Sequence, residues 1–178
     1  MSHVLLITLT GPDRVGLISE VTGRLFDLGA NLGDASFAVL GAGCEFSCLA
    51  DVDDALSAED IASQLGALPT LADAQIAVSD FTRPPEPAAN ARSTHVIEVS
   101  GGDRPGLIAR LSEVFVEFSA NVVRMNSARV LKPEGEAIYV TRFEVWLSPE
   151  RASACLSAVA NTAGQLQLDC QDREIGVE

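Results

Sequence analysis

Apolar residues follow two alternating spacings along the chain, and the whole pattern occurs twice. Residues 4–10 form a short β-rich apolar run that predicts a strand. Apolar side chains then recur every three or four residues over 17–28, which is the spacing of an amphipathic helix. The runs at 32–40 and 45–52 flank a glycine-containing turn and predict a β-hairpin.

A second helix and a last strand complete this half of the chain. Residues 57–68 have helical spacing, and Ser57 and Asp60 stand in the arrangement of a capping box. Residues 75–81 predict the last strand. The predicted order of the first half is therefore strand, helix, strand, strand, helix, strand (βαββαβ).

The second half predicts the same order. Helices are expected over 105–118 and from Pro149 onward, with Ser148 as a cap and the proline in the first turn. Strands are expected at residues 94–100, 122–131, 137–147 and 166–172, and a turn at 132–136 joins the middle two.

An internal repeat explains why the pattern occurs twice. Residues 11–18 and 101–108 both read Gly-x-Asp-Arg-x-Gly-Leu-Ile, and Ala-Asn recurs at 30–31 and 120–121 with the same offset. We therefore expect an α+β protein made of two tandem ferredoxin-like βαββαβ units, with antiparallel sheets and both helices on one face. The predicted domains are 1–82 and 94–178, joined by a proline- and alanine-rich linker at 83–93.

Charge and composition narrow the functional classes. The net charge is −13 and falls mostly on the first half. An acidic surface repels nucleic-acid phosphates and anionic membranes, so a small molecule or a protein is the expected partner. The N-terminal residues lack the basic segment of a signal peptide, and no apolar run reaches the ~20 residues that span a bilayer. A cytoplasmic location is expected.

The cysteines and histidines do not suggest a metal site or a cofactor. Histidine occurs only at His3 and His95, both in predicted strands. The four cysteines are expected to be small buried side chains in a reducing compartment, and they are Cys44, Cys48, Cys155 and Cys170.

The repeated strand-to-helix loop is the candidate site. Asp13 and Asp103 are expected to cap the helices and complement their dipoles. Gly16 and Gly106 would let another group approach the free N–H donors of the first turn. Such donors favour an anion, for example an amino-acid carboxylate. Glycine and aspartate are also common in turns without any ligand.

Asparagine and arginine recur beside this loop or at the far end of the helix. Asn31 and Asn121 stand where the helix ends and the second strand begins, where an amide can donate and accept. The alternative for each asparagine is a left-handed residue after the helix. Arg14 and Arg104 are not required by a turn, and they either contact a ligand or pair with nearby acidic groups.

The repeated Asp-Arg-x-Gly-Leu-Ile, followed by an amphipathic helix and Ala-Asn, resembles the start of an ACT domain, a regulatory module that commonly binds amino acids. Two such units alone resemble the glycine cleavage system transcriptional repressor family. This resemblance implies a cytoplasmic, non-catalytic protein that responds to a small amino acid, glycine foremost, and opposes a transcriptional activator by protein contact without binding DNA. A homo-oligomer, namely a dimer, is expected, and the alternative is that the two units pair within one chain.

The resemblance further implies that ligands sit between units, touching the loop of one and the helix-to-strand region of its neighbour. The residues implicated in this way are Asp13, Arg14, Gly16, Asn31, Asp103, Arg104, Gly106 and Asn121. The two copies differ, because Val15 corresponds to Pro105, and Arg110 and Arg129 stand where the first copy has Glu20 and Val39. The loops therefore need not bind the same ligand, and one of them can be silent.

Three other functions remain open. One is a detached regulatory subunit of a biosynthetic enzyme. Another is an acylphosphatase-like hydrolase using Arg14 and Asn31, although Asp13 would repel a phosphate. The third is an adaptor without a ligand, pairing through strand edges at 4–10 or through an acidic face. That face comprises Asp51, Asp53, Asp54, Glu59 and Asp60.

Overall fold

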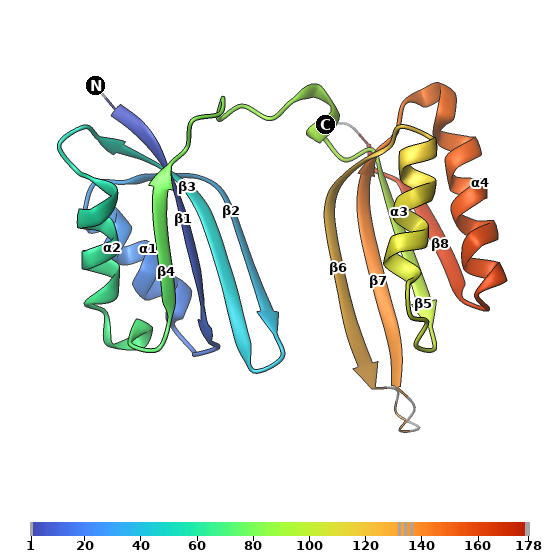
Figure 1. The fold of residues 1–178 in the computed structure, drawn as a ribbon, viewed down its shortest axis with the longest axis horizontal. Helices are drawn as coiled ribbons and strands as arrows, with labels where there is room; N and C mark the ends of the chain where they lie inside the picture. Colours follow the sequence, from blue (N-terminus) through green and yellow to red (C-terminus); the bar gives the residue numbers. More distant parts are fainter. Residues whose placement is uncertain (1, 132, 134, 136, 177–178) are drawn as a thin grey trace. The chain divides into compact units, whose positions relative to one another are not determined.

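The chain forms two compact units in a computed structural model that describes residues 2–131, 133, 135 and 137–176 (Figure 1). Unit 1 comprises Met1–Pro85 and unit 2 comprises Glu86–Glu178. The division between them falls inside the segment expected to be a linker. A short 3₁₀ turn at Ala89–Ala91 precedes the first strand of unit 2.

Unit 1 has the βαββαβ order and the strand order β2-β3-β1-β4, with every neighbouring pair antiparallel. Both helices lie on one side of the sheet (Figure 1). The elements are β1 (Ser2–Pro12), α1 (Leu17–Asp27), β2 (Asn31–Leu40), β3 (Gly43–Asp53), α2 (Ala58–Gly66), the 3₁₀ turn η1 (Pro69–Leu71) and β4 (Gln75–Asp80).

Unit 2 repeats this topology with the strand order β6-β7-β5-β8. The elements are β5 (His95–Gly101), α3 (Leu107–Glu117), β6 (Asn121–Leu131), β7 (Ala137–Trp146), α4 (Pro149–Gln165) and β8 (Asp169–Glu174). The predicted βαββαβ order is thus confirmed in both halves. Strands β6 and β7 pair as the expected hairpin, and residues 132, 134 and 136 of its turn lie outside the described residues.

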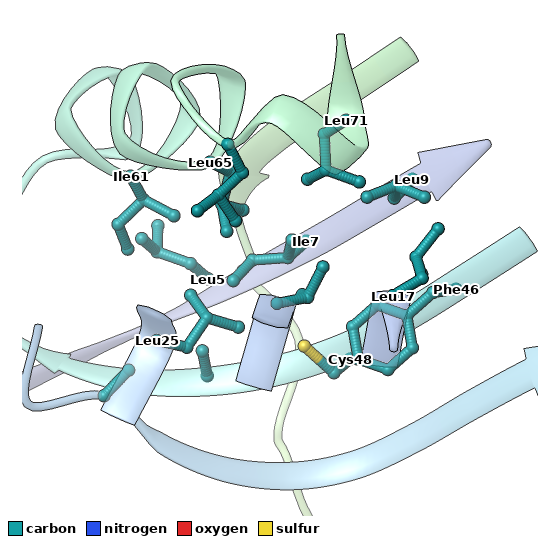
Figure 2. Close-up of a cluster of buried hydrophobic side chains, with 14 of the residues drawn as sticks. Leu5, Ile7, Leu9, Leu17, Leu25, Phe46, Cys48, Ile61, Leu65 and Leu71 are labelled. Carbon is teal, nitrogen blue, oxygen red and sulfur yellow. The ribbon is translucent and has the colours of Figure 1, made fainter. Parts of the chain in front are cut away.

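The core of unit 1 lies between the sheet and its helices (Figure 2). Alternate residues of β1 point to the helices, because successive strand side chains point to opposite faces. Leu5, Ile7 and Leu9 are at most 1% exposed, and Val21 and Leu25 of α1 pack against the same cluster. Burial of these aliphatic side chains is the main force that orients the helices on the sheet.

The core of unit 2 is built in the same way around two aromatic rings. Phe115 of α3 and Phe143 of β7 meet edge to face, with centroids 5.2 Å apart and ring planes at 65°. Burial also affects the cysteine thiols of both units. Removal of water disfavours the thiolate and raises the pKa of Cys48 and of Cys155 to about 11. Cys44 is buried as well, whereas Cys170 is only partly buried.

Capping residues were predicted with mixed success. The capping box is confirmed, because the Ser57 hydroxyl accepts from the Asp60 backbone N–H and the Asp60 carboxylate accepts from the Ser57 backbone N–H. Ser148 does occupy the N-cap of α4, with Pro149 in the first turn, but its side chain makes no capping hydrogen bond. The backbone carbonyl of Ser148 accepts from Arg151 and Ala152 instead.

Two expectations about strands are wrong. The last strand begins at Asp169 rather than 166, because α4 continues to Gln165 and Gln167 then takes a left-handed conformation with φ 59°. Residues 4–10 do not form a strand edge, because β1 lies between β3 and β4 with partners on both sides. The alternating apolar residues of this segment indicate which side chains are buried, but they do not indicate which strands pair with β1.

Helix length and polarity bear on membrane insertion. Among the residues that the structure describes, no helix combines the length and the apolar composition needed to cross a bilayer.

Candidate functional site

Each strand-to-helix loop ends in a glycine at the helix N-cap. Gly16 precedes α1 with φ 90°, and Gly106 precedes α3 with φ 83°, both in the left-handed region that suits glycine. The N–H of Leu107 donates to the carbonyl oxygen of Arg104 at 3.1 Å. No side chain of the described residues caps either helix. The remaining first-turn N–H groups therefore face outward as donors.

The prediction that Asp13 and Asp103 cap these helices is wrong. A capping side chain belongs at the N-cap, and that position is taken by a glycine further along each loop. The backbone N–H of Asp13 donates to the carbonyl oxygen of Ala42 at 3.2 Å. This bond joins the loop to the β2–β3 hairpin, while both aspartate side chains are exposed.

Arg14 holds its loop against the segment that leads into β4. Its Nη2 donates to Oδ2 of Asp73 at 2.7 Å, and its Nη1 donates to the carbonyl oxygen of Thr70 at 3.3 Å. The arginine thus pairs with an acidic group of its own unit. The side chains of Arg14 and Asp73 are 38% and 68% exposed, so we expect the pair to contribute less than about 1 kcal/mol.

Arg104 does the same in unit 2 with different partners. Its Nε donates to the carbonyl oxygen of Leu166 at 2.8 Å and its Nη2 to Oε1 of Gln167 at 3.4 Å. Its Nη1 donates to the carbonyl oxygen of Asp103 at 3.1 Å, within the loop itself. Both arginines therefore position a loop, and a ligand would meet the loop backbone that they hold.

The asparagines lie at the far end of the helix from the loop. Asn31 begins β2 and Asn121 begins β6, as the sequence predicts. An 11-residue helix is about 16 Å long, so neither asparagine shares a site with the loop of its own unit. Asn121 is engaged elsewhere, because its Nδ2 donates to the carbonyl oxygen of Asn90 at 2.8 Å.

The position of the asparagines bears on two alternatives for them, the acylphosphatase-like pair with arginine and the left-handed residue after the helix. Arg14 and Asn31 do not come together within unit 1, so that unit does not build the acylphosphatase-like pair. Left-handed conformations after the helices belong to Gly29 and Ser119, with φ 77° and 55°, and not to the asparagines. The asparagines are therefore strand residues rather than helix stops.

A cavity of about 270 Å³ opens beside the loop of unit 2. One side comes from the loop and the first turn of α3, which include the predicted residues Asp103, Arg104 and Gly106. The other side comes from β6 and β7. The side chains that line it there are Ser127, Tyr139 and Thr141.

Hydroxyl groups form this strand wall. The Oγ of Ser127 lies 2.8 Å from Oγ1 of Thr141, and Thr141 is only 2% exposed. Tyr139 adds a third hydroxyl and is the only tyrosine of the chain. Each hydroxyl has one donor hydrogen and two acceptor lone pairs, so the bonded pair keeps capacity for a ligand. Sequence reasoning missed all three residues.

Unit 1 has aromatic rings at the corresponding positions. Ser127 pairs with Thr141 across the β6–β7 ladder, and Phe37 pairs with Phe46 at the same place in the β2–β3 ladder. Phe46 is 4% exposed and belongs to the core cluster, where Figure 2 shows its ring. The two loops are thus alike, while the strand walls opposite them differ.

A larger cavity, about 690 Å³, lies between α4 and β8. Its lining is mostly apolar and includes His95, whose Nδ1 lies 2.9 Å from Oγ1 of Thr94. None of the predicted site residues lines it. Among the described residues, no three His, Cys, Asp or Glu side chains are grouped so as to hold a metal ion.

Comparison with known families agrees with this geometry. Residues 3–79 match the family model of the ACT domain. This match covers most of unit 1. Unit 2 has the same element order and strand order as unit 1, and its loop carries the same Asp-Arg-x-Gly-Leu-Ile sequence. The chain is thus a tandem arrangement of two ferredoxin-like folds, the first of which matches the ACT domain.

Two solved structures resemble this tandem arrangement over nearly the whole chain. An unknown protein from Galdieria sulphuraria is 20% identical with a TM-score of 0.77, over 99% of this chain and 100% of that one. A candidate glycine cleavage system transcriptional repressor is 15% identical with a TM-score of 0.67, over 99% of both chains. At these identities the likeness shows a shared fold. No curated protein sequence is significantly similar to the chain.

Proposed function

We propose that the chain is a non-catalytic, cytoplasmic regulator that binds a small amino acid, glycine foremost, and controls a transcriptional activator by protein contact as a homodimer. The observation that carries this proposal is the cavity beside the unit 2 loop. The match of unit 1 to the ACT domain and the whole-chain likeness to a candidate glycine cleavage system repressor support the same function.

The size and chemistry of the cavity suit an amino acid. Its volume of about 270 Å³ is below the ~300–1,000 Å³ of pockets that hold drug-sized ligands. The uncapped first turn of α3 presents N–H donors and the positive end of a helix dipole, which favour a carboxylate. The hydroxyl wall offers acceptors for an ammonium group.

The proposed binding residues are those of the loops and of the helix-to-strand junctions. Asn31 and Asn121 would contribute from a neighbouring unit, since each is about a helix length from its own loop. The loop residues are Asp13, Arg14, Gly16, Asp103, Arg104 and Gly106.

The net charge supports a protein partner rather than DNA. A charge of −13 opposes contact with phosphates, because binding to nucleic acid depends on lysine and arginine neutralising them. A repressor with such a surface would act by binding directly to the activator protein. The exposed acidic residues of unit 1, such as Asp51 and Asp53, suit a basic surface on that partner.

Calorimetric titration of the full chain with glycine, then L-serine and L-alanine, tests the ligand. Saturable heat with one of them supports the proposal, and no heat with any of them refutes the sensor. Purification from cells by a tagged chain tests the partner class. Recovery of a biosynthetic enzyme in place of a transcription factor would favour the detached regulatory subunit.

A further inference from the structure

The two units can be compared directly, because they share the strand-to-helix loop but differ in the strand residues opposite it. The loop sequence, the left-handed glycine and the uncapped helix are common to both units. The strand positions opposite the loop are not, since Ser127 and Thr141 replace the pair Phe37 and Phe46. These strand residues are therefore one place where binding can differ between the units, beside the loop positions 15 and 105.

In unit 1 an aromatic pair holds the positions that the two hydroxyls hold in unit 2. Phe46 is 4% exposed within the core cluster, which also contains Leu17 from the first turn of α1. Phe37 lies beside it on the edge strand and is 37% exposed. Two bulky rings leave less room beside the loop than two hydroxyl side chains, and an apolar wall cannot satisfy an ammonium group.

In unit 2 the same space has polar walls on two sides. Ile108 and Ala109 line the cavity from the first turn of α3, where N–H groups have no side-chain acceptor. Across from them stand the bonded hydroxyls of Ser127 and Thr141, with Tyr139 alongside. Donors on one side and acceptors on the other match the two ends of a zwitterion.

We infer that unit 2 alone binds the amino acid, with the carboxylate at the first turn of α3 and the ammonium at the hydroxyls of Ser127, Thr141 and Tyr139. Unit 1 is a filled copy of this site that binds no ligand, which narrows the proposed loop residues to Asp103, Arg104 and Gly106. The inference rests on the proposed function and adds to it which unit binds and which residues select a zwitterion. It also explains why unit 1 has the loop sequence but lacks the hydroxyl side chains opposite the loop.

Ser127→Phe copies the residue of unit 1 into unit 2 and tests the inference directly. Asn126→Phe is the matched control, because it is the preceding exposed residue of β6 and its side chain lies on the opposite face. Calorimetric titration with glycine and L-serine is carried out on both variants and on the unchanged chain. Fluorescence of the single tryptophan, Trp146, confirms that unit 2 remains folded.

We expect Ser127→Phe to abolish binding and Asn126→Phe to retain the original affinity. Thr141→Val provides a second test without a bulky group, and loss of a hydrogen bond to a charged ammonium predicts at least about tenfold weaker binding. If the unchanged chain binds and both cavity variants bind equally well, the inference is overturned and the proposed function stands. If the unchanged chain binds neither amino acid, the proposed function fails and the inference fails with it.

Discussion

The substitution Gly106→Ala should destabilise unit 2 by about 1 kcal/mol. A non-glycine residue in the left-handed region costs ~1–2 kcal/mol, and the stiffer unfolded chain offsets ~0.4–1 kcal/mol of that. Gly106 has φ 83°, and a Cβ built there meets no atom within 4 Å. The cost therefore comes from backbone strain and not from a clash. For a domain of this size, 1 kcal/mol corresponds to a fall in Tm of roughly 4–8 °C.

Unit 2 offers a control of opposite sign. Gly164 lies in helix α4 and a Cβ there also meets no atom within 4 Å. Gly164→Ala should stabilise unit 2 by up to about 1 kcal/mol, because alanine loses less conformational freedom in a helix than glycine. Urea unfolding monitored by Trp146 reports on unit 2 alone, since the chain has one tryptophan.

The two substitutions differ only in the backbone conformation that each must adopt. If Gly106→Ala stabilised unit 2 as Gly164→Ala is expected to do, the left-handed N-cap would not exist in solution. The argument that this glycine is required by the backbone would then be refuted. The approach of a ligand to the first turn would also need another explanation.

Three further predictions concern the cap, the thiols and an ion pair. Ser57→Ala should cost unit 1 about 1 kcal/mol in CD-monitored unfolding. Hydrogen bonds from the Ser57 hydroxyl and backbone N–H lower the pKa of Asp60, so the stability that these bonds contribute is present above the ordinary aspartate range and lost as pH falls through the lowered pKa. The variant should show a weaker dependence on pH, because its backbone N–H still donates to Asp60. Cys48 and Cys155, with pKa about 11, should resist iodoacetamide at pH 8 until the chain unfolds, as read by mass spectrometry. Arg14→Ala should cost less than about 1 kcal/mol, and the cost should fall in 1 M salt without vanishing, because salt screens the Asp73 pair while the hydrogen bond to the Thr70 carbonyl is lost in either case.

The sequence was sufficient for the order of elements because burial leaves a periodic trace. The spacing of Leu5, Ile7 and Leu9 in a strand, and of Val21 and Leu25 in a helix, follows directly from which side chains pack in the core. The 90-residue repeat then extended the assignment to the second half. Local chemistry was also readable, as the capping box at Ser57 shows.

Contacts between distant segments left no such trace. Arg14 contacts Asp73, and Arg104 contacts Leu166, only because the fold places each loop beside the segment that precedes the last strand of its unit. These partners are 59 and 62 residues apart in the sequence. Neither partner belongs to a recognisable motif. The position of β1 inside the sheet is likewise a matter of hydrogen-bond partners, which an apolar pattern does not specify.

The hydroxyl wall could not be found from the repeat offset, because the two hairpins differ in length. Ser127 and Phe37 keep the repeat offset, but Thr141 and Phe46 do not, because the second unit has a longer turn between its paired strands. A fixed offset therefore aligns Thr141 with the wrong residue of unit 1. Only the strand register shows that one site has exchanged two phenylalanines for two hydroxyls.

The number of ligands bound per chain tests the account most directly. Calorimetric titration of the full chain with the amino acid that binds, glycine first, should give one site per chain, because unit 2 has a hydroxyl-lined cavity beside its loop and unit 1 has Phe37 and Phe46 at the corresponding positions. Two equivalent sites per chain would contradict the filled copy in unit 1. No binding of any small amino acid would contradict the sensor itself.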